Sequence, residues 1–190
     1  MEKWVFEHSA ESDAPPESVW ERYTDVELWR EWSKGVEESE LEGEFEAGSE
    51  GQVKPPQLPR SKFELLEVEP ERRFVTQAKL PVGTGKIRIE YEVEPSNGGS
   101  RITHRAKIDG PLDFLWGPAV GWMVKRELAP SVDRLAELAV EKAEQAQKEE
   151  EEKEKRQQRL QKADEHFREE IKKTAPKEGE DRGAPSLPGG

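Results

Sequence analysis

Apolar and polar positions alternate along two successive stretches near the middle of the chain, residues 86–94 and residues 100–109. The positions on one side are Ile87, Ile89, Tyr91 and Val93 in the first stretch, and Ile102, His104, Ala106 and Ile108 in the second. This period of two predicts two strands with one buried face each, and the Asn97-Gly98 pair between them predicts a tight hairpin. The other faces are mainly acidic in the first stretch and basic in the second, so cross-strand ion pairs favour this register.

Residues 3–12 alternate in the same way, and they present Trp4, Phe6, His8 and Ala10 on one side. Turns rich in glycine and proline divide residues 36–80 into further short stretches, of which 61–69 and 72–80 are the longest. We therefore expect about six strands between residues 36 and 109. With residues 3–12 they make an antiparallel sheet of about seven strands, because sequential hairpins pair in that sense.

Two short amphipathic segments follow the first predicted strand. The proline pair at positions 15–16 favours a helix start, and this first helix extends to about Tyr23. A second short helix surrounds residues 28–32. Helices of this length are marginal alone in water, so both must dock through their apolar faces. Those faces carry the rings of Trp20, Tyr23, Trp29 and Trp32.

After Gly110 and Pro111 the apolar period becomes that of one long helix, with a stripe that runs from Leu112 to Ala139. This stripe is the surface that can lie across a sheet. A proline is tolerated in a first helical turn, but Pro130 lies inside the helix and is expected to kink it.

Beyond residue 145 the helical pattern continues without a broad apolar face. Glutamates precede lysines or arginines by four residues, a spacing that stabilises a solvated helix. A thin apolar stripe follows, at Leu160, Ala163, Phe167 and Ile171. The chain thus divides into a folded domain over 1–145, a charged helical extension over 146–174 that can bind a protein partner, and a disordered tail over 175–190.

Charge and composition exclude several classes of function. The net charge is -12, and residues 1–145 carry most of it, with 30 acidic and 19 basic side chains. Such a surface repels phosphate groups, so we expect neither nucleic acid nor an anionic membrane as a partner. No stretch approaches the ~20 apolar residues of a membrane helix, and no leader segment is evident at the start. We therefore expect a cytoplasmic protein without stable membrane insertion.

The absence of cysteine excludes disulfides and thiolate catalysis. Two histidines fall on predicted inner strand faces without a carboxylate on the same faces, which makes a poor metal site and gives no support to a hydrolytic triad. The glycines of PVGTGK, residues 81–86, have neither the spacing nor the context of a phosphate-binding loop. We expect no metal and no cofactor.

The order of the predicted elements resembles a known superfamily. The segments that carry the resemblance are APPESVWERYTDVELWREW, LEGEFEAGSEG, FELLEVEPERRFV, SRITHRAKIDGP and SVDRLAELAVE. Over about residues 3–142 they are similar to the START-like, or SRPBCC, superfamily, and most similar to its polyketide cyclase/dehydrase and lipid-transport group. The resemblance implies an α+β helix-grip fold, in which a curved antiparallel sheet of about seven strands wraps around a long C-terminal helix, with two short helices after the first strand.

Two further expectations follow from this resemblance. The first and last strands are neighbours, and the short helices support the long one, so Trp20, Trp29 and Trp32 fill that junction as core residues. The long helix begins near the opening of an apolar cavity that it forms with the sheet. For Trp116 and Trp122, which lie near this opening, a core position and a place in the cavity wall both stay open.

The candidate site consists of inward-facing residues of this cavity. His8 and His104 lie on the neighbouring first and last strands, and Tyr91 lies one strand further. Two imidazoles and a phenol can hydrogen-bond a ligand or transfer protons, so these three are the candidate catalytic residues. The expected ligand-binding residues are Phe6, His8, Phe74, Thr76, Tyr91, His104, Trp116 and Met123.

Three functions stay open at this point. The first is binding of a hydrophobic or aromatic small molecule, lipid-like or polyketide-like, in the cavity. The second is a cyclase or aromatase that uses general acid–base catalysis. The third is a protein-interaction module that acts through residues 146–174. A structural role competes with the first two, because buried histidines and tyrosines are commonly satisfied by each other or by the backbone.

Overall fold

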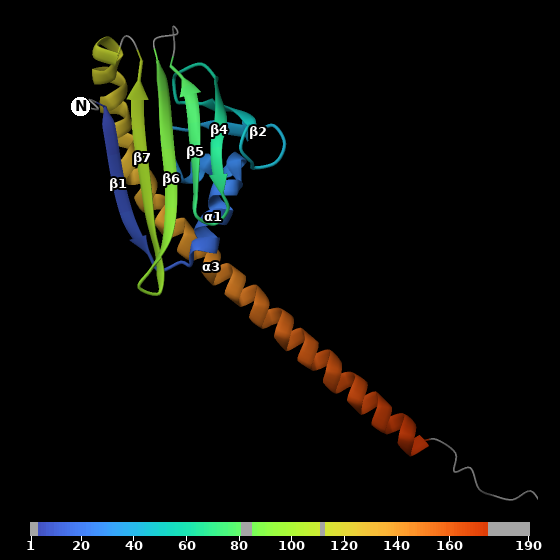
Figure 1. Cartoon of the computed structure of the whole chain (residues 1–190). Helices are drawn as coiled ribbons and strands as arrows, with labels where there is room; N and C mark the ends of the chain where they lie inside the picture. Colours follow the sequence, from blue (N-terminus) through green and yellow to red (C-terminus); the bar gives the residue numbers. More distant parts are fainter. Residues whose placement is uncertain (1–3, 81–84, 111–112, 175–190) are drawn as a thin grey trace, which may run out of the picture. The chain divides into compact units, whose positions relative to one another are not determined.

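A seven-stranded antiparallel sheet and one long helix dominate the structure, a computed structural model that describes residues 4–80, 85–110 and 113–174 (Figure 1). The elements in chain order are β1 (Val5–Ser12), α1 (Pro16–Thr24), η1 (Val26–Leu28), α2 (Trp29–Trp32), β2 (Glu38–Leu41), β3 (Glu50–Lys54), β4 (Ser61–Glu69), β5 (Arg73–Lys79), β6 (Lys86–Ser96), β7 (Gly99–Asp109) and α3 (Asp113–Thr174). The strand order is β1-β7-β6-β5-β4-β3-β2. The predicted α+β helix-grip fold is confirmed, including the neighbouring first and last strands.

The predicted hairpin joins β6 to β7. Ser96 pairs with Gly99, and the two residues between them, Asn97 and Gly98, have φ angles of 39° and 92°. Glycine adopts this left-handed conformation without strain, and asparagine tolerates it. This turn fixes the register of β6 against β7 over their whole length, and with it which side chains face inward.

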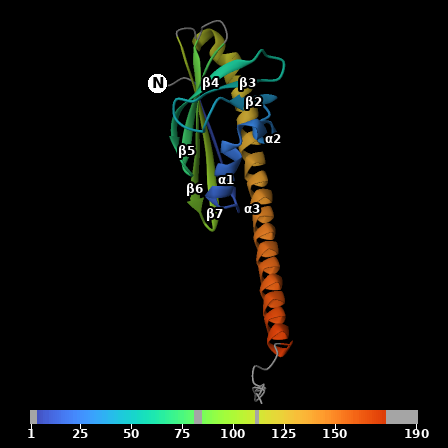
Figure 2. The ribbon, with the colours of Figure 1, turned by 90° about the vertical axis from the view of Figure 1, so that its right-hand side faces the viewer.

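The two short helices lie beside α3 on the inner side of the sheet (Figure 2). Their rings pack into the main apolar cluster together with inner-face residues of the strands. Tyr23, Trp29 and Trp32 are all buried, and Trp29 Nε1 donates a hydrogen bond to the Tyr23 carbonyl oxygen at 2.8 Å. The ring of Trp29 stacks on that of Phe74 with 6.2 Å between their centroids. The expectation that Trp29 and Trp32 are core residues is confirmed, and Trp20 packs partly buried against the same cluster.

The first part of α3 supplies the opposite wall of the core. Val132, Leu135 and Ala139 are completely buried and belong to the same apolar cluster as Phe74 and Tyr91. The helix α3 is continuous through Pro118 and Pro130. It is therefore a continuous cover for the inner face, as the apolar stripe predicts.

The chain divides into two compact units, Met1–Ala146 and Gln147–Gly190. In the second unit, the described residues continue the helix of α3 to Thr174, and the predicted ion pair between Glu151 and Lys155 is present at 3.1 Å. The side chains of its thin apolar stripe are exposed, among them Leu160, Phe167 and Ile171. The predicted disordered tail, 175–190, lies outside the described residues.

Candidate functional site

Four inner-face residues form a row across neighbouring strands. His8 of β1 is paired directly with His104 of β7, and His104 with Tyr91 of β6. Tyr91 is in turn paired with Phe74 of β5, and the two rings stack with centroids 4.3 Å apart. The hairpin register and the β1–β7 pairing thus bring together the three candidate catalytic residues, as their alternation predicts.

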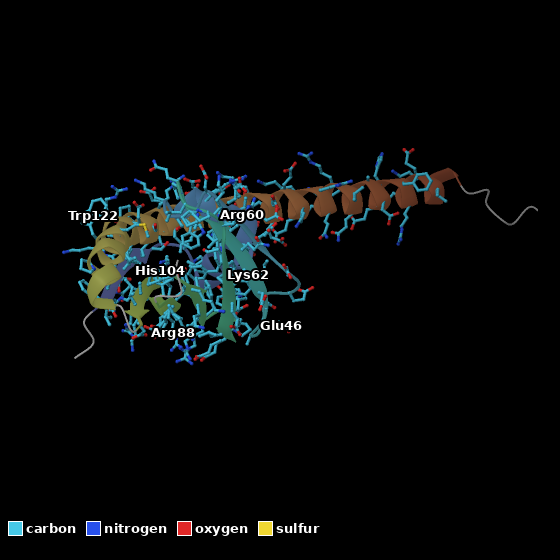
Figure 3. All side chains as sticks on the ribbon, turned by 90° about the horizontal axis from the view of Figure 1, so that it is seen from above. Glu46, Arg60, Lys62, Arg88, His104 and Trp122 are labelled. Atoms are coloured by element: carbon cyan, nitrogen blue, oxygen red, sulfur yellow. The ribbon has the colours of Figure 1, made fainter. Side chains whose placement is uncertain are left out.

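His104 lies at the centre of this row, and Figure 3 shows it between the sheet and α3. It is 1% exposed, and burial, with a smaller contribution from His8, lowers its pKa to about 3. Its Nε2 lies 2.9 Å from the Tyr23 hydroxyl. Burial also raises the pKa of Tyr23 well above its usual value. His104 is therefore neutral, and the protonated Tyr23 hydroxyl can donate to it.

Tyr91 is also enclosed, with 7% exposure, and burial raises its pKa to about 12. A hydrogen bond with Thr76, itself buried, opposes this rise. The polar groups of Tyr91, Thr76, Tyr23 and His104 thus find partners within the core. Because these groups are neutral and shielded from water, this end of the row favours a structural role over proton transfer.

His8 differs from His104 because it reaches solvent. Its side chain is 34% exposed, and its Nε2 donates to Asp133 Oδ1 of α3 at 3.1 Å. The expectation that no carboxylate orients a histidine of this row was wrong for His8. That expectation considered only the inner faces of the strands, whereas Asp133 comes from the helix, beside the buried Val132. A carboxylate-bound histidine at a partly exposed position can accept or donate a proton at its other ring nitrogen.

Toward the start of α3 the inner face is less completely covered. A second apolar cluster there is built on Ala106, Ile108 and Val124. Partly buried side chains surround it, and we call four of them the half-buried inner face: Phe6, Leu80, Ile87 and Ile89.

Gly121 lets α3 approach β1 closely at this cluster. A Cβ atom at position 121 would lie 2.9 Å from Phe6 Cζ and 3.2 Å from Trp4 Cε3. Trp4 also has a buried indole N–H, and this donor has no hydrogen-bond partner among the described residues. The half-buried inner face is thus apolar, with one unpaired donor beside it.

Trp122 and Met123 of α3 do not face the sheet. Trp122 is 63% exposed and has the Arg126 guanidinium 4.9 Å from its ring centroid, and Met123, expected among the ligand-binding residues, is 38% exposed. Successive helical residues are rotated by about 100°, so the two positions between the buried Gly121 and Val124 turn away from the sheet. The Trp116 side chain lies outside the described residues.

A hollow of about 350 Å³ occurs on a different part of the surface. It lies where η1 approaches the connection from β2 to β3, and its lining comprises Thr24, Asp25, Val26, Glu27, Leu41, Gly43, Glu44 and Phe45. None of the expected ligand-binding residues belongs to it. Its carboxylates and shallow form differ from the apolar cavity that the sequence predicts.

Two further classes of site were sought in the part of the chain that the structure describes. No three histidine, aspartate or glutamate side chains there converge as metal ligands. No helix there is both long and apolar enough to span a bilayer.

Residues 3–140 match the sequence profile of the polyketide cyclase/dehydrase and lipid transport family, and the chain belongs to this family. Family membership implies binding of a hydrophobic ligand without specifying which one. No curated protein matches the chain.

Several solved structures share the fold. Protein NE0264 from Nitrosomonas europaea is 19% identical, with a TM-score of 0.56 over 73% of this chain and 95% of its own. TTHA0849 from Thermus thermophilus is 17% identical, with a TM-score of 0.57 over 72% and 97%. Ara h 8.0201 is 15% identical, with a TM-score of 0.59 over 72% and 97%. At these identities the likeness shows the fold alone.

Proposed function

We propose that the chain binds a hydrophobic or aromatic small molecule, lipid-like or polyketide-like, between the sheet and the first part of α3. The observation that carries this proposal is the half-buried inner face, where Phe6, Ile87 and Ile89 are only partly buried, whereas Val93 and Ile102 further along β6 and β7 are almost completely buried. Removing such surface from water gains about 25 cal/mol per Å². A ligand that completes this cover is stabilised by the same effect that holds the core together.

The half of the inner face that lies beneath α1 leaves no comparable surface for a ligand. The ring centroids of Tyr23 and Phe74 are 5.0 Å apart, and those of Tyr91 and His104 are 4.7 Å apart. These are contact distances for aromatic rings, so the rings occupy that space themselves. The proposed ligand site is therefore the end of the core that contains Phe6, and not the space beneath α1.

Polar groups at this end define the complementary part of the ligand. The unpaired Trp4 Nε1–H is a buried donor, and the partly exposed His8 can donate or accept. On β1, β5, β6 and β7 no Asp, Glu, Lys or Arg takes an inner-face position. This combination fits an uncharged apolar body that carries a carbonyl or phenol oxygen, because a buried donor gains from an acceptor and a buried charge is costly.

Titration of the full chain with an apolar fluorescent probe, lipids and polyphenols tests the proposal through quenching of tryptophan fluorescence. We expect saturable binding that is weakened in Ile89→Glu, since this change places a charge on the half-buried inner face. Leu58→Glu is the matched control, because Leu58 is 42% exposed and remote from that face. The milder Phe6→Ala, which keeps the face apolar, guards against misfolding of Ile89→Glu. Absence of saturable binding across the panel overturns the proposal.

A second function, general acid–base catalysis of the cyclase or dehydratase class, is supported by the His8–Asp133 contact at 3.1 Å. A histidine that is oriented by a carboxylate and remains open to solvent meets the geometric requirement for a proton carrier. With a polyketide-like substrate, turnover is expected to fall sharply in His8→Ala and to persist in Tyr91→Phe, since Tyr91 is enclosed. Turnover that is unchanged in His8→Ala excludes His8 from this role.

A further inference from the structure

Charges on the outer face of the sheet are complementary over most of its area. Arg105 of β7 donates through Nε to Glu7 of β1 at 2.6 Å and through Nη1 to Glu90 of β6 at 3.3 Å. Near the β6–β7 turn, Arg101 donates to Glu11 at 2.7 Å. Opposite charges at facing positions stabilise a sheet, so this arrangement needs no functional explanation.

The pattern changes at the end of the sheet where β5 ends and α3 begins, the upper end in Figure 1. There Lys79 of β5 is paired directly with Lys86 of β6, and Arg88 of β6 with Lys107 of β7. Like charges at directly opposite positions destabilise a sheet. We call these four residues the basic patch.

Few carboxylates compensate for the basic patch. Asp109 of β7 faces Lys86 in the β6–β7 pairing and lies 3.7 Å from Lys107, but among the described residues no ion pair involves Lys79, Lys86 or Arg88. The side-chain partner of Arg88 is the neutral Gln77, at 3.4 Å. Such a concentration of cations stands out in a chain of net charge -12. The like-charged pairs do not themselves stabilise the sheet, so an external anion would relieve their repulsion.

The same strand segments carry the half-buried inner face. Leu80 follows Lys79 directly, and Ile87 stands between Lys86 and Arg88. The upper end of the sheet thus has an apolar inner side and a cationic outer side. This is the distribution that suits the boundary between head groups and acyl chains of a bilayer.

We propose that the basic patch docks the upper end of the sheet on an anionic lipid surface, from which the hydrophobic ligand is taken or to which it is delivered. The inference rests on the proposed function. The exposed side chains of Lys79, Lys86 and Arg88 suit lipid head groups, which are dispersed over a surface.

The net charge of the chain does not oppose this docking at close range. Salt screens charges beyond about 8 Å at physiological ionic strength, so the nearest groups decide the interaction. Glu42, Glu44 and Glu46 lie in the connection from β2 to β3, at the β2 edge of the strand order, whereas the basic patch lies on β5, β6 and β7. Figure 3 shows Glu46 and Arg88 at separate places. The sequence-based expectation that anionic membranes are repelled used the net charge of the chain, whereas docking depends on where the charges lie on the surface.

Sedimentation of the full chain with vesicles tests the proposal, using phosphatidylcholine with and without phosphatidylglycerol. We expect binding only to the anionic vesicles, and a decrease as salt is added. Lys79→Gln with Lys86→Gln lowers the partition coefficient by about fivefold per charge. The matched control is Lys34→Gln with Lys62→Gln, which removes two lysines outside the basic patch and leaves the partition nearly unchanged.

Thermal unfolding of the same variants separates docking from a structural role. Lys79→Gln with Lys86→Gln should keep or raise the Tm, because it removes a like-charged pair. Equal vesicle binding by both double variants overturns the proposal, as does patch-dependent binding to a DNA duplex without vesicle binding. If the apolar probe does not bind but patch-dependent vesicle binding persists, the proposed ligand function fails and the docking stands.

Discussion

His8 and His104 face each other as a directly paired couple on β1 and β7, yet only His104 is enclosed. His104 hydrogen-bonds the buried Tyr23, whereas His8 turns toward Asp133 and solvent. Adjacent imidazoles thus have different surroundings. The enclosed one is a neutral part of the core, and the accessible one contacts a helix carboxylate and solvent.

The enclosed position of His104 makes the stability of the fold depend on pH. Its pKa is lowered from 6.5 to about 3, so between these values the unfolded chain binds a proton that the native chain does not. Below about pH 6.5 the contribution of this residue to the free energy of unfolding therefore falls, by about 1.4 kcal/mol per pH unit, until the pH reaches its native pKa. NMR titration of the native protein checks this, and an imidazole signal of His104 that titrates near 6.5 contradicts it.

The hydrogen bond between Tyr23 and His104 predicts a coupling between these two residues. Tyr23→Phe removes the hydroxyl from Nε2 of a buried imidazole, and we expect a loss of about 1 to 3 kcal/mol in the free energy of unfolding. A double-mutant cycle with His104→Phe, followed by urea denaturation, should give a coupling of about 1 kcal/mol. Additive effects of the two changes would contradict a direct bond.

The first part of α3 contributes to stability in a way that the second unit does not. Leu135 is completely buried, so Leu135→Ala leaves a cavity and is expected to cost about 2 to 5 kcal/mol. Leu160→Ala is the matched control at a 62% exposed position, with an expected change within about 0.5 kcal/mol. Chemical denaturation compares the two, and similar losses would show that Leu160 is packed in solution.

Truncation after Ala146 tests the domain boundary that we expect near residue 145. The buried side chains of α3 end at Ala139, and Val140 and Ala143 pack partly buried against the core. The truncated chain should therefore unfold cooperatively at a Tm close to that of the full chain, by calorimetry. A partner that is recovered with the full chain and lost with the truncated one would locate the predicted protein interaction in residues 146–174. A large decrease in Tm would place part of the folding information in the second unit.

The strands were the most predictable part of the molecule, because alternation and turn chemistry are local properties. The pattern of residues 61–69 gave the bounds of β4 as observed, and the Asn97-Gly98 turn fixed the register that aligns Tyr91 with His104. The contacts from helices to the sheet were not predictable in this way. The partners of His104 and His8, Tyr23 and Asp133, depend on how far each helix is rotated about its axis, which no local pattern specifies.

The helical residues of the expected site were also hard to predict, because helix rotation decides which of them face the sheet. Met123 belongs to the apolar stripe of α3 by its spacing, but a stripe is wider than the surface that a sheet can cover. The structure places Met123 at the exposed margin. Trp4 was visible as an inward ring, but its unpaired N–H depends on the three-dimensional arrangement of its neighbours.

The close approach of α3 to Phe6 and Trp4 depends on the absence of a side chain at Gly121. A methyl group there would lie 2.9 Å from Phe6 Cζ, so the Phe6 ring would have to shift to accommodate it. Under the proposed function, Gly121→Ala is therefore expected to change the shape of the ligand-facing surface through Phe6, without addition of any polar group.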